Sequence, residues 1–393
     1  MLRGLVAAVL WGPAIAFAGL FTDIYVIGDS LSDIGNVEKT YADIVAARGG
    51  TPVPGFGAQI PGVPYYQGRA SNGPLWIDSL ARDPGTGMIA SALGGTNYAY
   101  GGARTEYQLY GPPFQGLLQQ KDALLADHPV LDPDALYVVW GGANNLQDIL
   151  ARQKSIGGPP RTLSETINDL QAIIDALAFG GARHFLVPNA PNIALVPRIR
   201  EIDAVRPGTA AAATSLTLAF NAGLAAMLGG EAARGLDIRS FDAYSLFNEV
   251  VADAAKYGFA NVTDRCYTGD DLRFTGGGTI CADPDTYLFW DGIHPTRVAH
   301  ALIAVAAWAA IPEPGTLLLL GLGLVVVGAR RLHARPELLA RCQDRRQRPQ
   351  TFWRKASTTE VRATRKAGNS AARNVAVTPT ANAASRTPGT TRT

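Results

Sequence analysis

Three residues that together support nucleophilic catalysis stand at opposite ends of this sequence. Ser30 closes the turn Gly28-Asp29-Ser30, directly after the short apolar run Asp23–Ile27. A serine just beyond the carboxyl end of a buried strand lies where open α/β sheets place their chemistry. Asp291 and His294 stand three residues apart near the other end. A serine hydroxyl needs a base, and a carboxylate orients that base, so these residues predict a serine nucleophile with its base and acid.

His294 is the predicted general base. It would take the Ser30 proton and deliver it to the leaving alkoxide, while Asp291 fixes the imidazole tautomer and stabilises the imidazolium. Pro295 stiffens the turn that follows the base. The other histidines lack a comparable setting, and His300, six residues further along, is the alternative base.

Strand-like and helical patterns alternate along the chain and would position these residues. The strand-like runs are 23–27, 96–100, 135–140, 183–188 and 236–241. Apolar residues recur at helical spacing from Leu163 to Leu177 and again from Leu216 to Leu228, and Gly180-Gly181 ends the first of these helices. Strands that alternate with helices predict an α/β domain with a mostly parallel sheet covered on both faces.

Five further segments resemble the GDSL branch of the SGNH hydrolase family. In chain order they are GRASNGPLWIDSLA (68–81), GGTNYAYGGART (94–105), VVWGGANNL (138–146), YGFANVTDRC (257–266) and LFWDGIHPT (288–296). With the serine turn they span about residues 22–310. The resemblance implies a three-layer α/β/α fold of flavodoxin-like type with a mostly parallel central sheet. It also implies hydrolysis of carboxylic esters through a serine acyl-enzyme, with neither a cofactor nor a metal ion.

The same resemblance implies an oxyanion hole built from the backbone N–H of Ser30, the backbone N–H of Gly102 and the side-chain amide of Asn144. Loss of one such donor typically costs about 2.7–4 kcal/mol of transition-state stabilisation. Gly101 is the alternative to Gly102, and a helix N-cap is the alternative role of Asn144. The family usually has aspartate after this asparagine, whereas the chain has Asn145. Asparagine is nearly isosteric with aspartate and can still cap the following helix, so we expect activity to survive.

Two of the three cysteines flank a glycine-rich loop that leads to the predicted base. In an exported protein Cys266 and Cys281 are expected to form a disulfide. It would close a loop of about 15 residues and stabilise the fold by about 3 kcal/mol. Two free thiols are the alternative, and Cys342 has no evident partner in the sequence. No cysteine–histidine cluster has the spacing of a zinc site.

Residues 1–18 have the pattern of a secretory signal. Arg3 is the positive residue, residues 5–16 form the apolar run, and Ala16-Phe17-Ala18 fits a cleavage site. An uncleaved anchor or a buried first helix is the alternative. Residues 19–310 are then predicted to form the hydrolase domain.

Residues 311–335 contain a second export element. Pro312-Glu313-Pro314 precedes the apolar run 315–329, which Arg330-Arg331 follows. Such a run is typical of a short membrane span with its basic end in the cytoplasm. Together these features resemble the PEP-CTERM sorting signal of Gram-negative bacteria, which implies an exosortase as partner and transit through the inner membrane. A hydrophobic helix packed on the domain is the alternative.

The basic charge of the chain is concentrated at its end. The 64 residues from Arg330 onward carry 15 basic and 3 acidic side chains, which leaves 20 basic and 30 acidic ones in the other 329 residues. Residues 336–393 are rich in Arg, Thr, Ala and Pro and are expected to be disordered. An acidic body argues against a nucleic acid as partner.

The sequence therefore predicts a secreted or surface-sorted serine esterase in the periplasm, on the outer surface or in the extracellular matrix of a Gram-negative bacterium. Its substrates would be acyl lipids, short-chain esters or O-acetylated polysaccharide, and no residue indicates the oligomeric state. The alternatives are a thioesterase or an acyltransferase, and a catalytically silent carbohydrate-binding or matrix protein on the same fold.

Overall fold

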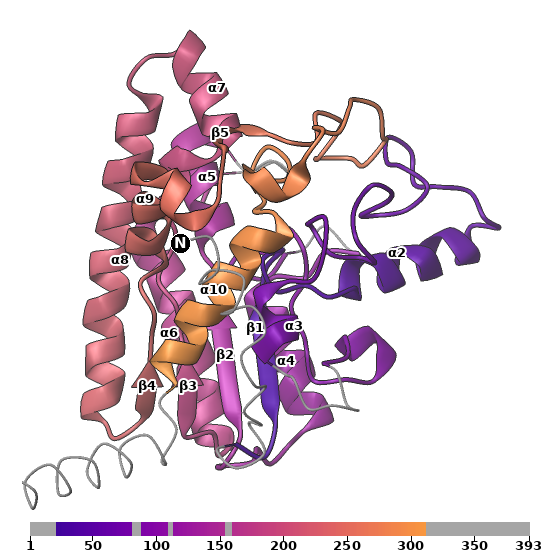
Figure 1. The fold of residues 1–393 in the computed structure, drawn as a ribbon. Coiled ribbons are helices and arrows are strands. Elements are labelled where there is room, and N and C mark those ends of the chain that lie inside the picture. The colour runs from indigo at the N-terminus through magenta and orange to yellow at the C-terminus, as the bar shows by residue number, and fades with distance from the viewer. Residues whose placement is uncertain (1–20, 81–87, 109–112, 154–158, 312–393) are drawn as a thin grey trace, which may run out of the picture. The chain divides into compact units, whose positions relative to one another are not determined.

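The computed structural model describes residues 21–80, 88–108, 113–153 and 159–311 of the chain. The predicted signal segment 1–18, the sorting segment beyond residue 311 and the tail 336–393, which contains Cys342, lie outside these residues. Within them the chain forms an α/β structure in which helices cover both faces of a parallel sheet (Figure 1).

Four parallel strands form the central sheet in the order β1-β2-β3-β4. They are β1 (Ile24–Gly28), β2 (Leu136–Trp140), β3 (His184–Leu186) and β4 (Asp237–Arg239). The first two are rich in β-branched and aromatic residues, which suit a pleated surface buried on both sides. Their register pairs Gly28 with Trp140, so both strands end at the same edge of the sheet. All four strands were predicted from the apolar runs.

The fifth predicted run, residues 96–100, lies along β1 without forming a regular strand. The Val26 N–H donates to Thr96 O at 3.1 Å, and the Tyr98 N–H donates to Val26 O at 2.7 Å. The Gly28 N–H, which would continue this ladder by donating to Tyr98 O, donates instead to Gln120 Oε1 at 2.9 Å. A side-chain acceptor therefore interrupts the ladder, and the prediction of a full strand was wrong here.

Helices alternate with the strands. They are α2 (Asn36–Ala47), α3 (Trp76–Leu80), α4 (Leu117–Asp127), α5 (Ala143–Ala151), α6 (Leu163–Gly180), α7 (Pro197–Val205), α8 (Thr209–Ala233), α9 (Ala243–Ala252) and α10 (Arg297–Ala310). Short 3₁₀ turns lie at Ser91–Leu93, Ile193–Leu195, Ala254–Tyr257 and Pro284–Thr286. At the predicted end of α6, Gly181 adopts φ +127°, which favours glycine.

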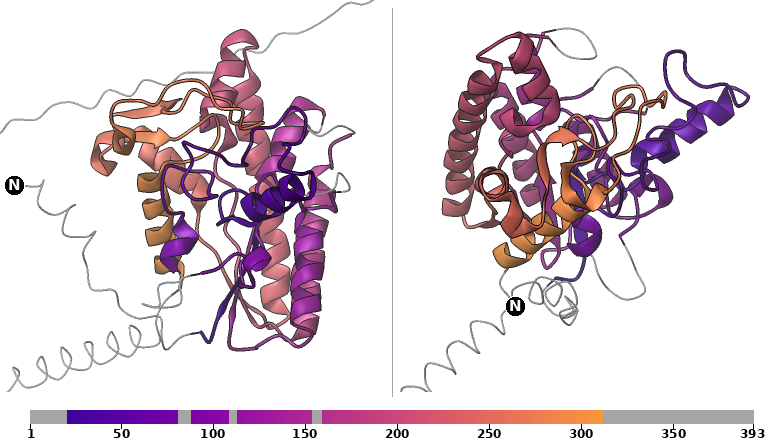
Figure 2. Two further views of the ribbon diagram at one scale, coloured as in Figure 1. Left: turned by 90° about the vertical axis from the view of Figure 1, so that its right-hand side faces the viewer. Right: turned by 45° about the horizontal axis from the view of Figure 1, so that its top comes forward.

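The strand side chains alternate between two hydrophobic cores, as the period of a strand requires. Ile27 and Val139 lie in the core shared with α4, α5, α6 and α8. Val26 and Val138 lie in the core shared with α3, α9 and α10. The sheet is thus the middle of three layers, and Figure 2 shows it between the two sets of helices. The predicted three-layer α/β/α architecture is confirmed.

α8 is the one helix in the described ranges that is long and apolar enough to cross a membrane. About a third of its most apolar stretch is buried (33%), and its Phe220 and Leu224 belong to the core. This packing is that of a core helix.

A second sheet of two parallel strands was not predicted. It pairs β5 (Asn261–Arg265) with β6 (Tyr287–Phe289). The residues of β5, NVTDR, are mostly polar and only partly buried, so no apolar run marks this strand in the sequence. β6 leads directly into the segment that contains Asp291 and His294 and therefore positions the predicted base.

Candidate active site

Ser30, His294 and Asp291 meet at the carboxyl end of β1. The Nε2 atom of His294 lies 2.8 Å from Ser30 Oγ, and its Nδ1 atom lies 2.7 Å from Asp291 Oδ2. The serine follows β1, whereas the other two residues follow β6. The fold thus brings the predicted serine, base and acid into one hydrogen-bonded chain, which is the geometry needed to move a proton away from the hydroxyl.

The three-residue spacing of Asp291 and His294 has a local cause. Asp291 Oδ1 accepts the backbone N–H of Ile293 at 2.9 Å and that of His294 at 2.8 Å. The Trp290 N–H donates to His294 O at 2.7 Å and closes the turn. One carboxylate oxygen therefore shapes the loop, and the other is left to orient the imidazole.

The pKa values of the pair shift in opposite directions. Burial opposes the charged form of His294, but the charge and hydrogen bond of Asp291 outweigh it and raise the pKa of His294 above its usual 6.5. Burial likewise opposes the charge on Asp291, but His294 and the two backbone N–H groups lower the pKa of this carboxyl. Asp291 is therefore ionised at neutral pH and accepts the Nδ1–H, so that Nε2 faces the serine as a base.

His300, the alternative base, lies elsewhere. It is 1% exposed on α10, and its Nδ1 accepts the Trp76 backbone N–H at 3.4 Å. Burial lowers the pKa of His300 to about 3, so the ring stays neutral. The pocket at Ser30 is lined by His294 and not by His300.

Asp33 holds the serine turn against the loop that contains Gly101 and Gly102. Its Oδ1 accepts the N–H of Gly35 and of Asn36, at 2.8 and 2.7 Å. Its Oδ2 accepts the Gly101 N–H at 2.8 Å. Burial raises the pKa of Asp33 to about 6, although these N–H donors counteract it.

Gly102 is the better placed of the two candidate oxyanion glycines. The Gly101 N–H is already used by Asp33, whereas the N–H groups of Ser30 and Gly102 donate to no acceptor within the described part of the chain. Gly102 has φ +74°, a conformation that favours glycine and turns its peptide away from the strand direction. These two N–H groups are therefore available to a ligand.

Asn144 supplies an amide beside the serine. It lines the same pocket as Ser30, and its Nδ2 donates to Ala103 O at 2.9 Å, which leaves the second amide hydrogen for a ligand. The N-cap alternative is wrong, because Gly142 caps α5 and Asn144 lies inside the helix.

Asn145 does not cap the helix, because it lies inside α5. Its Oδ1 accepts the Thr105 N–H at 3.0 Å, and its Nδ2 donates to Glu106 Oε2 at 2.8 Å. All three residues are buried. The amide therefore joins the start of α5 to the loop that follows Gly102, using both its acceptor and its donor.

A buried ion pair that was not predicted reinforces the same joint. Nε and Nη2 of Arg104 each donate to Asp148 at 2.8 Å, and Nη1 donates to Gly102 O at 2.8 Å. Arg104 lies in the segment 94–105, which resembles the family, and this was its only signal in the sequence. Because Asp148 and Asn144 lie on the same helix, the pair fixes the two candidate oxyanion donors relative to each other.

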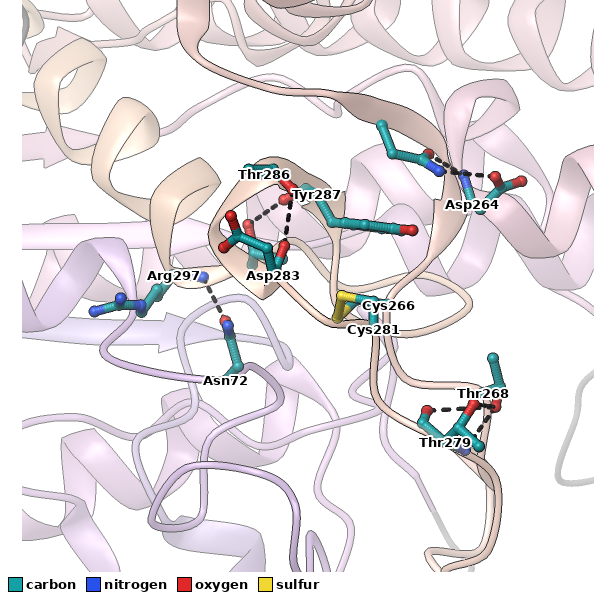
Figure 3. Close-up of a disulfide and its surroundings, with 12 residues drawn as sticks. Asn72, Asp264, Cys266, Thr268, Thr279, Cys281, Asp283, Thr286, Tyr287 and Arg297 are labelled. Carbon is teal, nitrogen blue, oxygen red and sulfur yellow. Dashed lines mark hydrogen bonds between the residues drawn. A yellow bond between two sulfur atoms is a disulfide. The ribbon is translucent and has the colours of Figure 1, made fainter.

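Cys266 and Cys281 form a disulfide that closes the loop before β6 (Figure 3). The Thr268 N–H donates to Thr279 O at 3.0 Å beside the bridge. Inside the loop, Asp271 accepts the Gly292 N–H at 2.8 Å and contacts Arg198 Nη2 at 2.7 Å. Through Asp271, the bridged loop holds the backbone between Asp291 and His294. No signal in the sequence indicated this role of Asp271.

An open pocket lies beside Ser30 and His294, and its empty space, the adjoining solvent included, is about 590 Å³. Besides Ser30, Asn144 and His294, the polar residues Asp29, Gln147 and Asn192 line the pocket, and the rest of its wall is apolar. The larger apolar residues are Leu31, Ile193, Val196, Phe247, Phe289 and Ile293. Among the described residues no group of three acidic, histidine or cysteine side chains could hold a metal ion.

Comparison with known proteins identifies two patterns in the chain. Residues 24–307 match the family model described as GDSL-like lipase/acylhydrolase. Residues 310–332 match the PEP-CTERM protein-sorting motif.

Individual relatives are similar over most of the chain. A phosphatidylcholine-sterol acyltransferase of Aeromonas hydrophila is 27% identical over 73% of this chain and 89% of that protein. A GDSL esterase/lipase of Arabidopsis thaliana is 26% identical over 71% of this chain and 85% of that protein. Among solved structures, an acetyl xylan esterase is 15% identical, with a TM-score of 0.36 over 74% of this chain and all (100%) of that one.

Proposed function

The chain belongs to the GDSL-like lipase/acylhydrolase family, and we propose that it hydrolyses carboxylic esters through an acyl-enzyme on Ser30. The observation that carries this proposal is the 2.8 Å contact of His294 Nε2 with Ser30 Oγ, together with Asp291 on the other ring nitrogen.

Each proposed step would use one of the groups described above. Ser30 Oγ bonds to the acyl carbon as its proton passes to His294 Nε2, and Asp291 stabilises the imidazolium that forms. The N–H groups of Ser30 and Gly102 and the amide of Asn144 bind the oxyanion. The alcohol leaves with the proton from His294, and a water molecule activated by the same base then releases the acid.

We propose that the substrate is an ester with a hydrocarbon acyl group longer than acetyl. The pocket beside Ser30 is lined by Phe247 and Phe289, both of which are buried in the protein. Apolar walls of this kind stabilise methylene groups by about 0.8 kcal/mol each. An acetyl group would use little of this wall.

The sorting motif at 310–332 indicates export through an exosortase in a Gram-negative bacterium. We propose that residues 1–18 start this export, that residues 19–310 form the hydrolase domain, and that the enzyme acts at the outer surface. An acyl lipid or an acylated matrix component would be encountered there.

The test is hydrolysis of p-nitrophenyl esters from acetate to palmitate by the full chain, beside two serine variants. We expect turnover that rises beyond acetate. Ser30→Ala should lose at least about a thousandfold in kcat, since the nucleophile is absent. Ser215→Ala, which removes an exposed hydroxyl on α8, should match the parent.

Two outcomes would change the assignment. Transfer of the acyl group to an added alcohol in preference to water would favour an acyltransferase, the activity named for the Aeromonas hydrophila relative. A folded protein without serine-dependent turnover on any ester would contradict the proposal and favour a silent surface module.

A further inference from the structure

Asp291 accepts one hydrogen bond that plays no part in the serine mechanism described above. The Tyr65 hydroxyl donates to Asp291 Oδ2 at 2.8 Å, and the same oxygen receives the His294 Nδ1–H at 2.7 Å. The other carboxylate oxygen is used by the N–H groups of Ile293 and His294. Asp291 is fully buried (0% exposed), so the charge that faces the imidazole depends on these few donors.

Aromatic packing fixes the Tyr65 ring in this position. The ring makes edge-on contacts with Tyr267, Phe274 and Trp290, with centroids 5.6, 5.2 and 6.3 Å apart. The Tyr65 N–H also donates to Gly62 O at 3.0 Å. Trp290 directly precedes Asp291, so the cluster holds the tyrosine and the acid together. The Tyr65 hydroxyl is therefore held at a fixed position beside Asp291.

The hydroxyl of Tyr65 remains a donor over the working pH range. Burial raises the pKa of Tyr65 far above its usual value, and the adjacent charge of Asp291 raises it further. A neutral phenol can only donate to an ionised carboxylate, so the direction of this hydrogen bond is fixed.

We propose that Tyr65 is a positioning residue that holds Asp291 against His294 and moderates the negative charge that the imidazole meets. A second donor on Oδ2 shares the electron density of that oxygen, so the carboxylate attracts the imidazolium less strongly. Tyr65 would thereby lower the pH at which His294 becomes a free base. This inference rests on the proposed serine mechanism and adds a residue to it.

Other charged groups also face His294 and must be held constant. Asp271, on the disulfide loop, favours its protonated form, whereas Arg198, at the start of α7, opposes it. Asp29, in the serine turn, and His300, on α10, interact with it from the other sides. A substitution at Tyr65 leaves these four residues unchanged, so its effect on the pKa of His294 can be separated from theirs.

Tyr65→Phe in the full chain is the test, with Tyr267→Phe as matched control. Tyr267 lies in the same aromatic cluster, and its hydroxyl donates to no residue in the described ranges. The first readout is the pKa of His294, which is measured by NMR titration of the isotope-labelled imidazole ring without substrate. The second is the acid limb of kcat/KM on a p-nitrophenyl ester. Thermal unfolding of both variants monitors the fold.

We expect Tyr65→Phe to raise both midpoints by about half to one pH unit and to leave those of Tyr267→Phe at the parent value. Unchanged midpoints in Tyr65→Phe, even with a lower kcat, would overturn the proposal and leave Tyr65 a structural residue. The NMR titration needs no turnover. Failure of the esterase assignment, seen as full activity in Ser30→Ala, is therefore distinguishable from failure of this inference.

Discussion

His294 decides the pH at which Ser30 can be activated. The base must be neutral to accept the serine proton, and its raised pKa keeps it protonated above its ordinary midpoint of 6.5. We predict that kcat/KM rises with pH through a midpoint above 6.5, measured on a p-nitrophenyl ester between about pH 5 and 9. A midpoint at or below 6.5 would show that Asp291 does not stabilise the imidazolium in the free enzyme.

The residues of this site differ in how far the sequence could predict them. Ser30, Asp291 and His294 carry a recognisable spacing, because Asp291 both shapes its own loop and orients the base. Tyr65 and Asp271 reach the same loop from distant segments, Tyr65 being 226 positions from Asp291. Contacts of that kind depend on how loops pack across the top of the sheet, which no local pattern encodes.

At the level of elements, the joint between α5 and the Gly102 loop depends on amide chemistry at position 145. Asn145→Asp removes the donor to Glu106 and places a second carboxylate beside it in a buried site. We predict a loss of about 2–3 kcal/mol in the free energy of unfolding at neutral pH, measured with urea. The loss should shrink at pH 5, because one carboxyl of the pair takes up a proton in the folded variant. A variant as stable as the parent at neutral pH would contradict the role assigned to the amide.

The burial of a strand's side chains decides whether the strand could be predicted from the sequence. β1 and β2 are buried on both faces and therefore read as continuous apolar runs. β5 lies in a small, partly exposed sheet with polar residues and left no such signal. Residues 96–100 have the apolar run without the strand, because the Gly28 N–H of β1 donates to the Gln120 side chain and not to this segment.

For the molecule as a whole, the predicted cleavage after Ala18 is compatible with the fold. The described contacts begin at Phe21, whose ring centroid lies 5.4 Å from that of His184. They continue at Thr22, whose N–H donates to Asp134 O at 3.1 Å and whose hydroxyl donates to Asp132 at 2.6 Å. We predict that the exported protein begins at Gly19, as measured by mass spectrometry of its N-terminal peptide. Recovery of the intact first 18 residues on the exported protein would contradict this prediction.

The central claim is that Ser30 is a nucleophile activated by His294, and the most direct measurement is covalent labelling. The full chain would be treated with a fluorophosphonate, and the modified residue would be identified by peptide mass spectrometry. The account predicts a single label on Ser30, formed far more slowly in His294→Gln and absent from Ser30→Ala. No label on a folded protein, or a label on Ser30 that forms equally fast without His294, would contradict it.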